Sequence, residues 1–258
     1  MNNYLKISCL ELLFFRLNTN FEAFREGIYY TRILEYPIVI NNLNLRKKDK
    51  ILEIGCSYVN PVVPYLLAKN YNLSLIEKNT PTPNEDILIK CLEKENNIKI
   101  NISVKDGKQT DTKKNYFDKI YSISAIEHEK GIGDIRIMDE IFRILKSKGR
   151  AVITVPFNKE KLLETEQEYG FERRYNLESI KKRLIGSRFK LKKIIFLKQT
   201  FKLSKFISAI PWCIKKNIGF LLNLFGFILW SKKEFNNLKE LEKINLDKHT
   251  VVCLVLEK

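Results

Sequence analysis

The segment Ile51-Leu52-Glu53-Ile54-Gly55-Cys56-Ser57 decides the fold of this chain. A short, mostly apolar run suited to a buried strand leads into a glycine, which lets the backbone turn sharply and approach a ligand closely. A strand, a glycine turn and a helix are typical of an open parallel sheet, where ligands bind beyond the carboxyl ends of the strands. Gly55 lacks the further glycines of G-x-G-x-x-G, so the turn disfavours a dinucleotide pyrophosphate site.

Short apolar runs alternate with helical runs after this turn. The strands that we expect are Ile51–Gly55, Leu73–Glu77, Ile98–Val104, Phe117–Ser122 and Ala151–Val155, with Phe189–Leu197 and Thr250–Leu256 later in the chain. The helices that we expect are Pro61–Lys69, Asn84–Glu95, Asp134–Lys146, ending at Lys148-Gly149, and Leu177–Ile185. Strands that alternate with helices predict right-handed crossovers and a mostly parallel sheet with helices on both faces.

Five short segments of this region follow one another in the order and spacing of a known family. They are residues 51–57 (ILEIGCS), Asp106-Gly107 with Phe117-Asp118, residues 124–128 (SAIEH), residues 142–149 (FRILKSKG) and Val152–Pro156. Together they resemble the class I S-adenosylmethionine-dependent methyltransferases, especially the type-11 small-molecule group. The resemblance covers Ile51–Val155. It implies an α/β, Rossmann-like fold with a seven-stranded, mostly parallel sheet, and S-adenosyl-L-methionine as the cofactor.

The resemblance also implies a set of cofactor-binding residues at the ends of the expected strands. They are Glu53, Gly55, Cys56, Ser57, Glu77, Asp106, Gly107 and Ser124. Glu53 and the backbone of Gly55–Ser57 would hold the methionine part of the cofactor. Glu77 would accept hydrogen bonds from the ribose hydroxyls, although a solvated glutamate at a strand end is the alternative. Asp106 would bind the adenine amino group.

The acceptor is expected over the end of the fourth strand, beside Ser124, Glu127 and His128. His128 is the better candidate for a general base, because an imidazole titrates near neutral pH. A structural histidine that caps the next helix is an equally open interpretation. Glu127 would orient the acceptor or simply lie in a loop, and His249 is expected at the surface.

Several chemistries are disfavoured by what the sequence lacks. The segment Ser122–Ala125 stands where amine-specific and amide-specific enzymes of this fold carry (N/D)-P-P-Y. No cysteine lies near the ends of the fourth and fifth strands, which disfavours methylation of pyrimidine carbon through a cysteine adduct. No cluster of metal ligands is apparent, so we expect no metal.

The positive charge is concentrated in one window. The chain has 46 Lys and Arg against 30 Asp and Glu, a net charge of +16, yet residues 179–233 contain 14 Lys and Arg and no acid. The apolar run Ile218–Trp230 lies in this window and is too short to span a bilayer. We consider three roles for the window: contact with an anionic membrane surface, binding of RNA, and a lid whose lysines are merely solvated. The continuous apolar run favours lipid or core over nucleic acid.

The chain is expected to be a single methyltransferase domain over residues 1–258. Its parts would be a helical cap at 1–48, the Rossmann-like core at 49–198, a basic, apolar and partly helical insertion at 199–245, and the last strand at 246–258. Five cysteines without a C-x-x-C pair are typical of free thiols in a cytoplasmic protein, with attachment to the inner face of the membrane as an open possibility.

The sequence thus predicts an S-adenosylmethionine-dependent methyltransferase. The acceptor would be a small molecule, a lipid-linked compound or a glycan, methylated on oxygen or nitrogen. Two alternatives remain at this stage, a non-catalytic membrane-associated module that retains the fold and an RNA methyltransferase.

Overall fold

The computed structural model describes residues 32–55, 62–97, 99–167, 170–199, 230–243, 246 and 249–258. Most of the expected helical cap, and residues 200–229 of the expected insertion, lie outside the described residues. No helix in the described ranges is long and apolar enough to cross a membrane.

The main sheet has eight strands in the order β3-β2-β1-β4-β5-β10-β8-β9. Their bounds are β1 Lys50–Ile54, β2 Asn72–Glu77, β3 Asn101–Val104, β4 Phe117–Ile123, β5 Leu145–Pro156, β8 Lys190–Gln199, β9 Trp230–Phe235 and β10 His249–Glu257. The five strands from β3 to β5 are parallel, whereas β10 runs antiparallel between β5 and β8. This arrangement confirms the Rossmann-like, mostly parallel fold that the sequence predicts. The sheet has one strand more than predicted, because β9 pairs with β8 from within the expected insertion.

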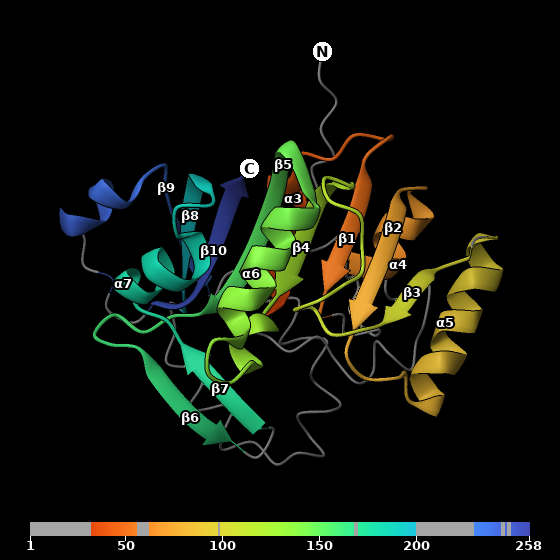
Figure 1. Ribbon diagram of the computed structural model, residues 1–258, viewed down its shortest axis with the longest axis horizontal. Helices are drawn as coiled ribbons and strands as arrows, with labels where there is room; N and C mark the ends of the chain where they lie inside the picture. The colour runs from red at the N-terminus through yellow and green to blue at the C-terminus, as the bar shows by residue number, and fades with distance from the viewer. Residues whose placement is uncertain are drawn as a thin grey trace.

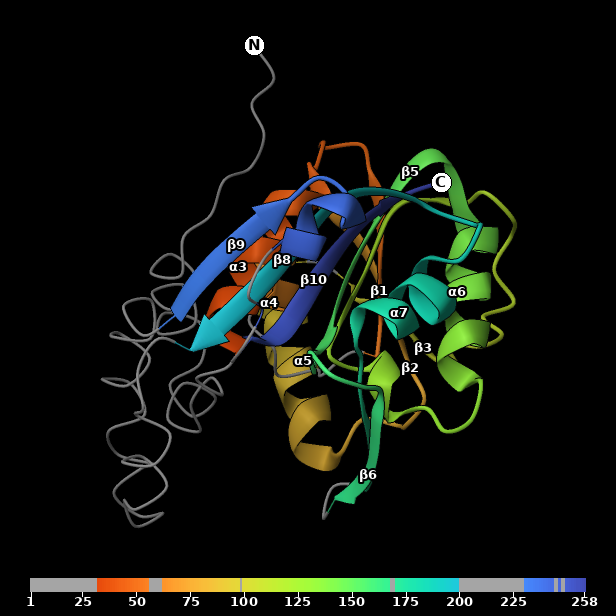
Figure 2. The ribbon, with the colours of Figure 1, turned by 90° about the vertical axis from the view of Figure 1, so that its left-hand side faces the viewer.

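Helices cover both faces of the sheet, as Figure 2 shows. On one face lie α3 (Arg32–Leu43), α4 (Val62–Ala68) and α5 (Pro83–Asn96). On the other lie α6 (Gly133–Ile144) and α7 (Leu177–Ser179), which continues as a π-helical turn, η2 (Ile180–Ile185). Short 3₁₀ turns occur at η1 (Ile126–His128) and η3 (Leu238–Lys243).

Side-chain alternation along the strands builds a separate core on each face. In β4, Ile120 packs on the α6 face while its neighbour Tyr121 packs on the α3 face. The α6 side chains at helical spacing, Ile137, Met138 and Ile141, are all buried against the sheet. The period of each element therefore determines which core its apolar residues join.

The helix α6 ends earlier than the sequence predicts. We expected it to run to Lys146, with Lys148-Gly149 as the stop signal, but the helix ends at Ile144. Leu145 already pairs with Phe117 of β4, so extended backbone begins there, and the sharp turn falls at Lys148, which has a positive φ of 60°.

A two-stranded hairpin that the sequence did not predict follows β5. It consists of β6 (Leu163–Gln167) paired antiparallel with β7 (Gly170–Arg174). In Figure 1 the hairpin lies at the lower left, on the side toward which β1 and β2 point. It therefore stands beside the end of the sheet where ligands of this fold bind.

Candidate active site

A cavity of about 350 Å³ opens at the carboxyl ends of β1, β2 and β4. The strand order reverses between β1 and β4, because β2 and β3 extend to one side of β1 while β5 follows β4 on the other. Such a switch point is where open parallel sheets bind ligands. The residues that line the cavity are Ile54, Gly55, Ile76, Glu77, Lys78, Asn79, Lys105, Gly107, Ser124, Ala125, Ile126, His128, Glu129 and Ile137.

Gly55 is required at its position by a close approach of two strands. Its φ is +75°, and a Cβ atom added to it would lie 2.3 Å from Cβ of Ala125. Its N–H donates to the carbonyl of Ile76 at 3.0 Å. The ends of β1, β2 and β4 are therefore held together by backbone contacts that leave no room for a side chain at residue 55.

Glu77 presents a carboxylate to the cavity at the end of β2. Its Oε1 atom accepts the backbone N–H groups of Lys78 at 2.9 Å and of Asn79 at 3.3 Å. Its Oε2 atom has no hydrogen-bond partner within the described part of the chain. Burial raises the pKa of this carboxyl above its usual value, while the two backbone N–H groups act in the opposite direction. The carboxylate is thus oriented by one oxygen and can accept hydrogen bonds from a ligand with the other.

Ser124 is held at the end of β4 by a carboxylate from α3. Its hydroxyl donates to Oε2 of Glu35 at 3.0 Å, and the Thr154 hydroxyl donates to the same oxygen at 2.7 Å. The backbone of Ser124 has a positive φ of 42°, and its N–H donates to the Thr154 carbonyl at 3.0 Å. Glu35 is 1% exposed, so α3 contributes a buried acid that fixes this wall of the cavity. Glu35 is not among the residues predicted from the sequence, although a lone acid within the apolar run of α3 was a usable signal.

His128 lines the cavity and is oriented by the hairpin. Its Nδ1 atom lies 2.8 Å from the carbonyl oxygen of Phe171 in β7. A carbonyl can only accept, so Nδ1 carries a proton and Nε2 has the lone pair in the neutral ring. His128 does not cap the next helix, because the N-cap of α6 is Ile132 and the His128 ring contacts the Phe171 carbonyl instead.

Three predicted site residues do not line the cavity. Glu53 is buried and accepts a hydrogen bond from the Tyr121 hydroxyl at 3.0 Å. Asp106 bonds to Lys108, and Glu127, within η1, is 1% exposed. The predicted residues that do gather at the cavity wall are Gly55, Glu77, Gly107, Ser124 and His128. Cys56 and Ser57 lie outside the described residues.

An ion-pair bridge that the sequence did not predict joins two loops at the cavity. Oε2 of Glu129 lies 2.6 Å from Nζ of Lys108, and its Oε1 lies 3.5 Å from Nζ of Lys78. Lys108 also lies 3.1 Å from the Asp106 carboxylate. Burial alone would raise the pKa of Asp106, but the hydrogen bonds and charge of Lys108 hold it below its usual value. Lys108 therefore links the loop after β3 to the loop that carries His128.

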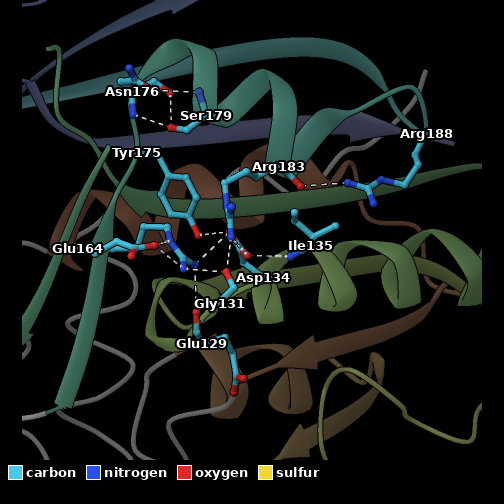
Figure 3. A network of polar contacts seen from close by, with 11 residues as sticks. Glu129, Gly131, Asp134, Ile135, Glu164, Tyr175, Asn176, Ser179, Arg183 and Arg188 are labelled. Carbon is cyan, nitrogen blue, oxygen red and sulfur yellow. Dashed lines mark hydrogen bonds and ion pairs between the residues drawn. The ribbon is translucent and has the colours of Figure 1, made fainter. Parts of the chain in front are cut away.

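A buried polar network supports the same loop from behind. Figure 3 shows Tyr175, Asp134 and Arg183 pointing toward one another. The Tyr175 hydroxyl donates to Oδ2 of Asp134 at 2.9 Å, and Arg183 donates to both carboxylate oxygens at 2.8 and 2.7 Å. Burial, together with Asp134, raises the pKa of Tyr175 far above its usual value, so its hydroxyl keeps the proton that it donates.

The residues present at the cavity fit S-adenosyl-L-methionine. Glu77 offers a carboxylate oxygen for a ribose diol, and the wall at Gly55 is backbone alone. The apolar side chains of Ile54, Ile76 and Ile126 line the space between them and suit an adenine ring. The N–H and C=O groups, the acid and the apolar lining together match a ligand that is part nucleoside and part amino acid.

Comparison with known proteins gives the same answer for the core of the chain. Residues 52–153 match the family model described as a methyltransferase domain, type 11. Among curated proteins, none matches the chain.

Three solved structures share the fold at low sequence identity. Coclaurine N-methyltransferase bound to N-methylheliamine and S-adenosylhomocysteine is 12% identical, with a TM-score of 0.60 over 98% of this chain and 82% of that one. The Burkholderia thailandensis 1,6-didemethyltoxoflavin-N1-methyltransferase, bound to 1,6-didemethyltoxoflavin and S-adenosylhomocysteine, is 11% identical, with a TM-score of 0.57 over 89% and 78%. The cyclase SpnF is 16% identical, with a TM-score of 0.56 over 87% and 80%. Because one of these enzymes is named a cyclase, the likeness establishes the fold alone.

The family match and the cavity at the switch point therefore lead to one assignment. Residues 52–153 form a methyltransferase domain of the Rossmann-like class I type, with S-adenosyl-L-methionine as its methyl donor.

Proposed function

We propose that this methyltransferase methylates an oxygen or nitrogen atom of a small-molecule acceptor, with His128 as the general base. The observation that carries the proposal is the bond from His128 Nδ1 to the Phe171 carbonyl at 2.8 Å, which leaves a basic Nε2 on a side chain of the cavity wall. S-adenosyl-L-methionine, when bound, supplies an electrophilic methyl group. The protein has to align the acceptor and remove its proton. As the O–H or N–H bond of the acceptor breaks, the proton would pass to Nε2 and the acceptor atom would bond to the methyl carbon, whose bond to sulfur would break to leave S-adenosylhomocysteine.

The cofactor contacts that we propose follow from the places of the predicted residues. Glu77 binds the ribose hydroxyls, and Gly107 lies beside the adenine. Glu53, with the backbone of residues 55–57, holds the methionine part, and Ser124 closes the site at the end of β4. Asp106 has to give up its contact with Lys108 in order to bind the adenine amino group. Glu127, within η1, orients the acceptor indirectly, through the conformation of that turn.

The acceptor class that we propose is a small molecule, with a lipid-linked compound or a glycan as narrower candidates. The coclaurine and didemethyltoxoflavin enzymes are both N-methyltransferases by name, which supports a small acceptor and a nitrogen nucleophile. The lipid-linked candidate depends on the basic window 179–233. It fits a single domain over residues 1–258 that lies in the cytoplasm and touches the inner face of the membrane through that window.

The described part of the window is less positive than its sequence suggests. Acids outside the window or next to it pair with five of its basic residues. These pairs are Arg183 with Asp134, Arg188 with Asp139, Lys192 with Glu257, and Lys193 and Lys232 with Glu234. Lys181 and Lys182 are exposed, and in the described residues neither forms an ion pair. Lys190, Lys198 and Lys233 likewise form no ion pair in the described ranges, so a membrane contact would use these five lysines and only part of the formal charge.

Titration calorimetry with S-adenosylhomocysteine, followed by a methyl-transfer assay over a panel of amines and phenols, tests the proposal. His128→Asn should bind S-adenosylhomocysteine as the parent does and lose about 10²- to 10⁴-fold in kcat, the usual contribution of a general base. His249→Asn, at the second histidine of the chain, is the matched control and should keep its kcat. Full turnover by His128→Asn would exclude the general-base role. A lack of cofactor binding at millimolar concentration would favour a non-catalytic module that retains the fold. Methyl transfer to RNA alone would favour an RNA methyltransferase.

A further inference from the structure

Arg173 of β7 is a fully buried cation that joins four segments of the chain. Its side chain is 0% exposed. Its guanidinium donates to the carbonyls of Glu129 and Gly131, both at 3.0 Å, and to Oε1 of Glu164 at 2.9 Å from Nε. It also lies 3.2 Å from Oδ2 of Asp134 at the start of α6. A planar guanidinium with its donors in a fixed fork is suited to holding two carbonyls and a carboxylate at once.

These contacts enclose His128 from two sides. The Glu129 carbonyl belongs to the residue directly after His128. On the other side, Phe171 supplies the carbonyl that accepts the proton of His128 Nδ1, and its ring lies 5.1 Å from the guanidinium carbon of Arg173. Arg173 thus fixes both the backbone that carries His128 and the strand that orients it.

Charge balance at Asp134 does not explain why Arg173 is buried. Arg183 already donates to both oxygens of Asp134, and Tyr175 donates to Oδ2. The Gly131 carbonyl also accepts from Arg183, so the contacts that Arg173 alone supplies are the bond to the carbonyl of Glu129, the residue after His128, and the bond to Glu164. Its particular contribution is therefore to the position of the loop.

We propose that Arg173 is the positioning residue that keeps His128 in the tautomer with a proton on Nδ1 and a lone pair on Nε2; its effect on turnover rests on the general-base role proposed above. By tying the loop to β7, Arg173 keeps Nδ1 within hydrogen-bond distance of the Phe171 carbonyl. When this tie is lost the ring rotates or shifts, and part of the population carries its proton on Nε2. Such a ring cannot accept a proton from the acceptor.

Other charged groups surround the loop, and a substitution of Arg173 by lysine leaves their identities unchanged. Near the cavity, the segments after β2 and β3 carry Glu77, Lys78, Lys105 and Lys108, and the His128 loop itself carries Glu127, Glu129 and Lys130. Asp134 and Arg183 lie behind the loop, and the hairpin carries Glu164, Glu166 and Glu172. A variant at residue 173 therefore tests position against an otherwise unchanged set of charges.

The experiment is ¹⁵N NMR of the imidazole rings in the complex with S-adenosylhomocysteine, at a pH about two units above the usual histidine pKa of ~6.5. The parent should show one His128 tautomer, with the proton on Nδ1, assigned by comparison with His249→Asn. Arg173→Lys keeps the positive charge but cannot reach both carbonyls. In this variant His128 should be a mixture of the Nδ1–H and Nε2–H tautomers. Its kcat should fall about 10- to 100-fold, with unchanged affinity for S-adenosylhomocysteine.

The control is Arg174→Lys, the next residue on the same strand, whose side chain is 45% exposed and pairs with Glu172 alone among the acids of the described chain. It should keep the parent tautomer and kcat. A folded Arg173→Lys protein with the parent tautomer would overturn the proposal. If Arg173→Lys does not fold, Glu164→Gln decides, because Glu164 is half-exposed and its loss releases only one side of Arg173. An unchanged tautomer in a folded Glu164→Gln protein would equally overturn it.

The two proposals fail in different ways. If the general-base role is wrong, His128→Asn keeps its turnover while the tautomer of Arg173→Lys still shifts. If the positioning role is wrong, His128→Asn loses turnover while the tautomer of Arg173→Lys stays as in the parent.

Discussion

At the scale of single residues, Gly55 and Gly131 separate the two reasons for which a chain needs glycine. Both have positive φ angles, +75° and +61°. A Cβ atom at Gly55 would collide with Ala125, whereas at Gly131 nothing lies within 4 Å of the added atom among the described residues. The glycine of the first turn is therefore needed for space as well as for backbone conformation.

We expect Gly55→Ala to lower the free energy of unfolding by about 2–4 kcal/mol, since it adds a steric clash to backbone strain. It should also abolish measurable S-adenosylhomocysteine binding, because the ends of β1 and β4 must move apart. Gly131→Ala, with strain alone, should cost about 1 kcal/mol and keep binding. Denaturant titration and calorimetry measure both effects. Equal losses of stability in the two variants would contradict the steric clash expected between a Cβ atom at residue 55 and Ala125.

At the scale of elements, α6 is tied to the loop after β3 by one buried acid. Oε1 of Glu140 accepts the N–H of Thr110 at 2.8 Å and its hydroxyl at 2.6 Å, and Arg143 donates to the same carboxylate at 2.6 and 2.8 Å. Burial by itself would raise the pKa of Glu140, but Arg143 and Thr110 hold it below its ordinary value of 4.5. The loop fixed in this way carries Lys105 and Gly107 of the cavity wall.

This contact should make stability depend on pH in the acid range. A carboxyl whose pKa is lowered on folding stabilises the protein above its unfolded pKa, and that contribution is lost as the pH falls through the folded value. Glu140→Gln should therefore lose about 1–3 kcal/mol at neutral pH, and the gap to the parent should close as the pH falls below about 4.5. The control is Asp139→Asn, at the half-exposed neighbour that pairs with Arg188. The difference between its free energy of unfolding and that of the parent should stay constant over this pH range. Urea titrations at several pH values measure this, and a gap that persists at low pH would count against it.

At the scale of the whole molecule, the uneven charge is the property that bears on where the protein acts. The parallel half of the sheet carries the cofactor cavity, while the antiparallel strands β8 and β9 carry much of the described part of the window 179–233. Ion pairs to Asp134, Asp139, Glu234 and Glu257 consume part of the charge of that window. The net charge of +16 therefore overstates the positive surface that a membrane could meet.

We expect the protein to pellet with anionic vesicles and not with neutral ones, and to be released by raising the salt concentration, because screening weakens contacts between exposed charges. Replacing both Lys181 and Lys182 by Glu should weaken pelleting, since each basic residue near an anionic surface contributes about 1 kcal/mol. The matched control replaces Lys113 and Lys114, an exposed pair outside the window, by Glu. Equal pelleting of the two double variants would remove the window from the membrane proposal, and salt-sensitive binding to RNA instead would favour nucleic acid.

The sequence by itself determined the parts of this protein that depend on local pattern. Alternating apolar periods predicted the strands from β1 to β5 and the helices between them, because side chains repeat every second residue in a strand and about every fourth in a helix. The glycine after β1 and the acid at the end of β2 marked one edge of the sheet, since parallel strands bring their carboxyl ends together. These residues suffice to locate the cavity.

Only the tertiary structure decided which distant residues support that cavity. Glu129 and Arg173 resemble ordinary surface residues in the sequence, and their partners lie in other elements. A buried charge is stable only where specific donors or acceptors meet it, and no local period encodes that meeting. The hairpin β6–β7 escaped prediction for the same reason: its two short strands are held by the carbonyls of the His128 loop and by Asp134 rather than by an apolar pattern of their own.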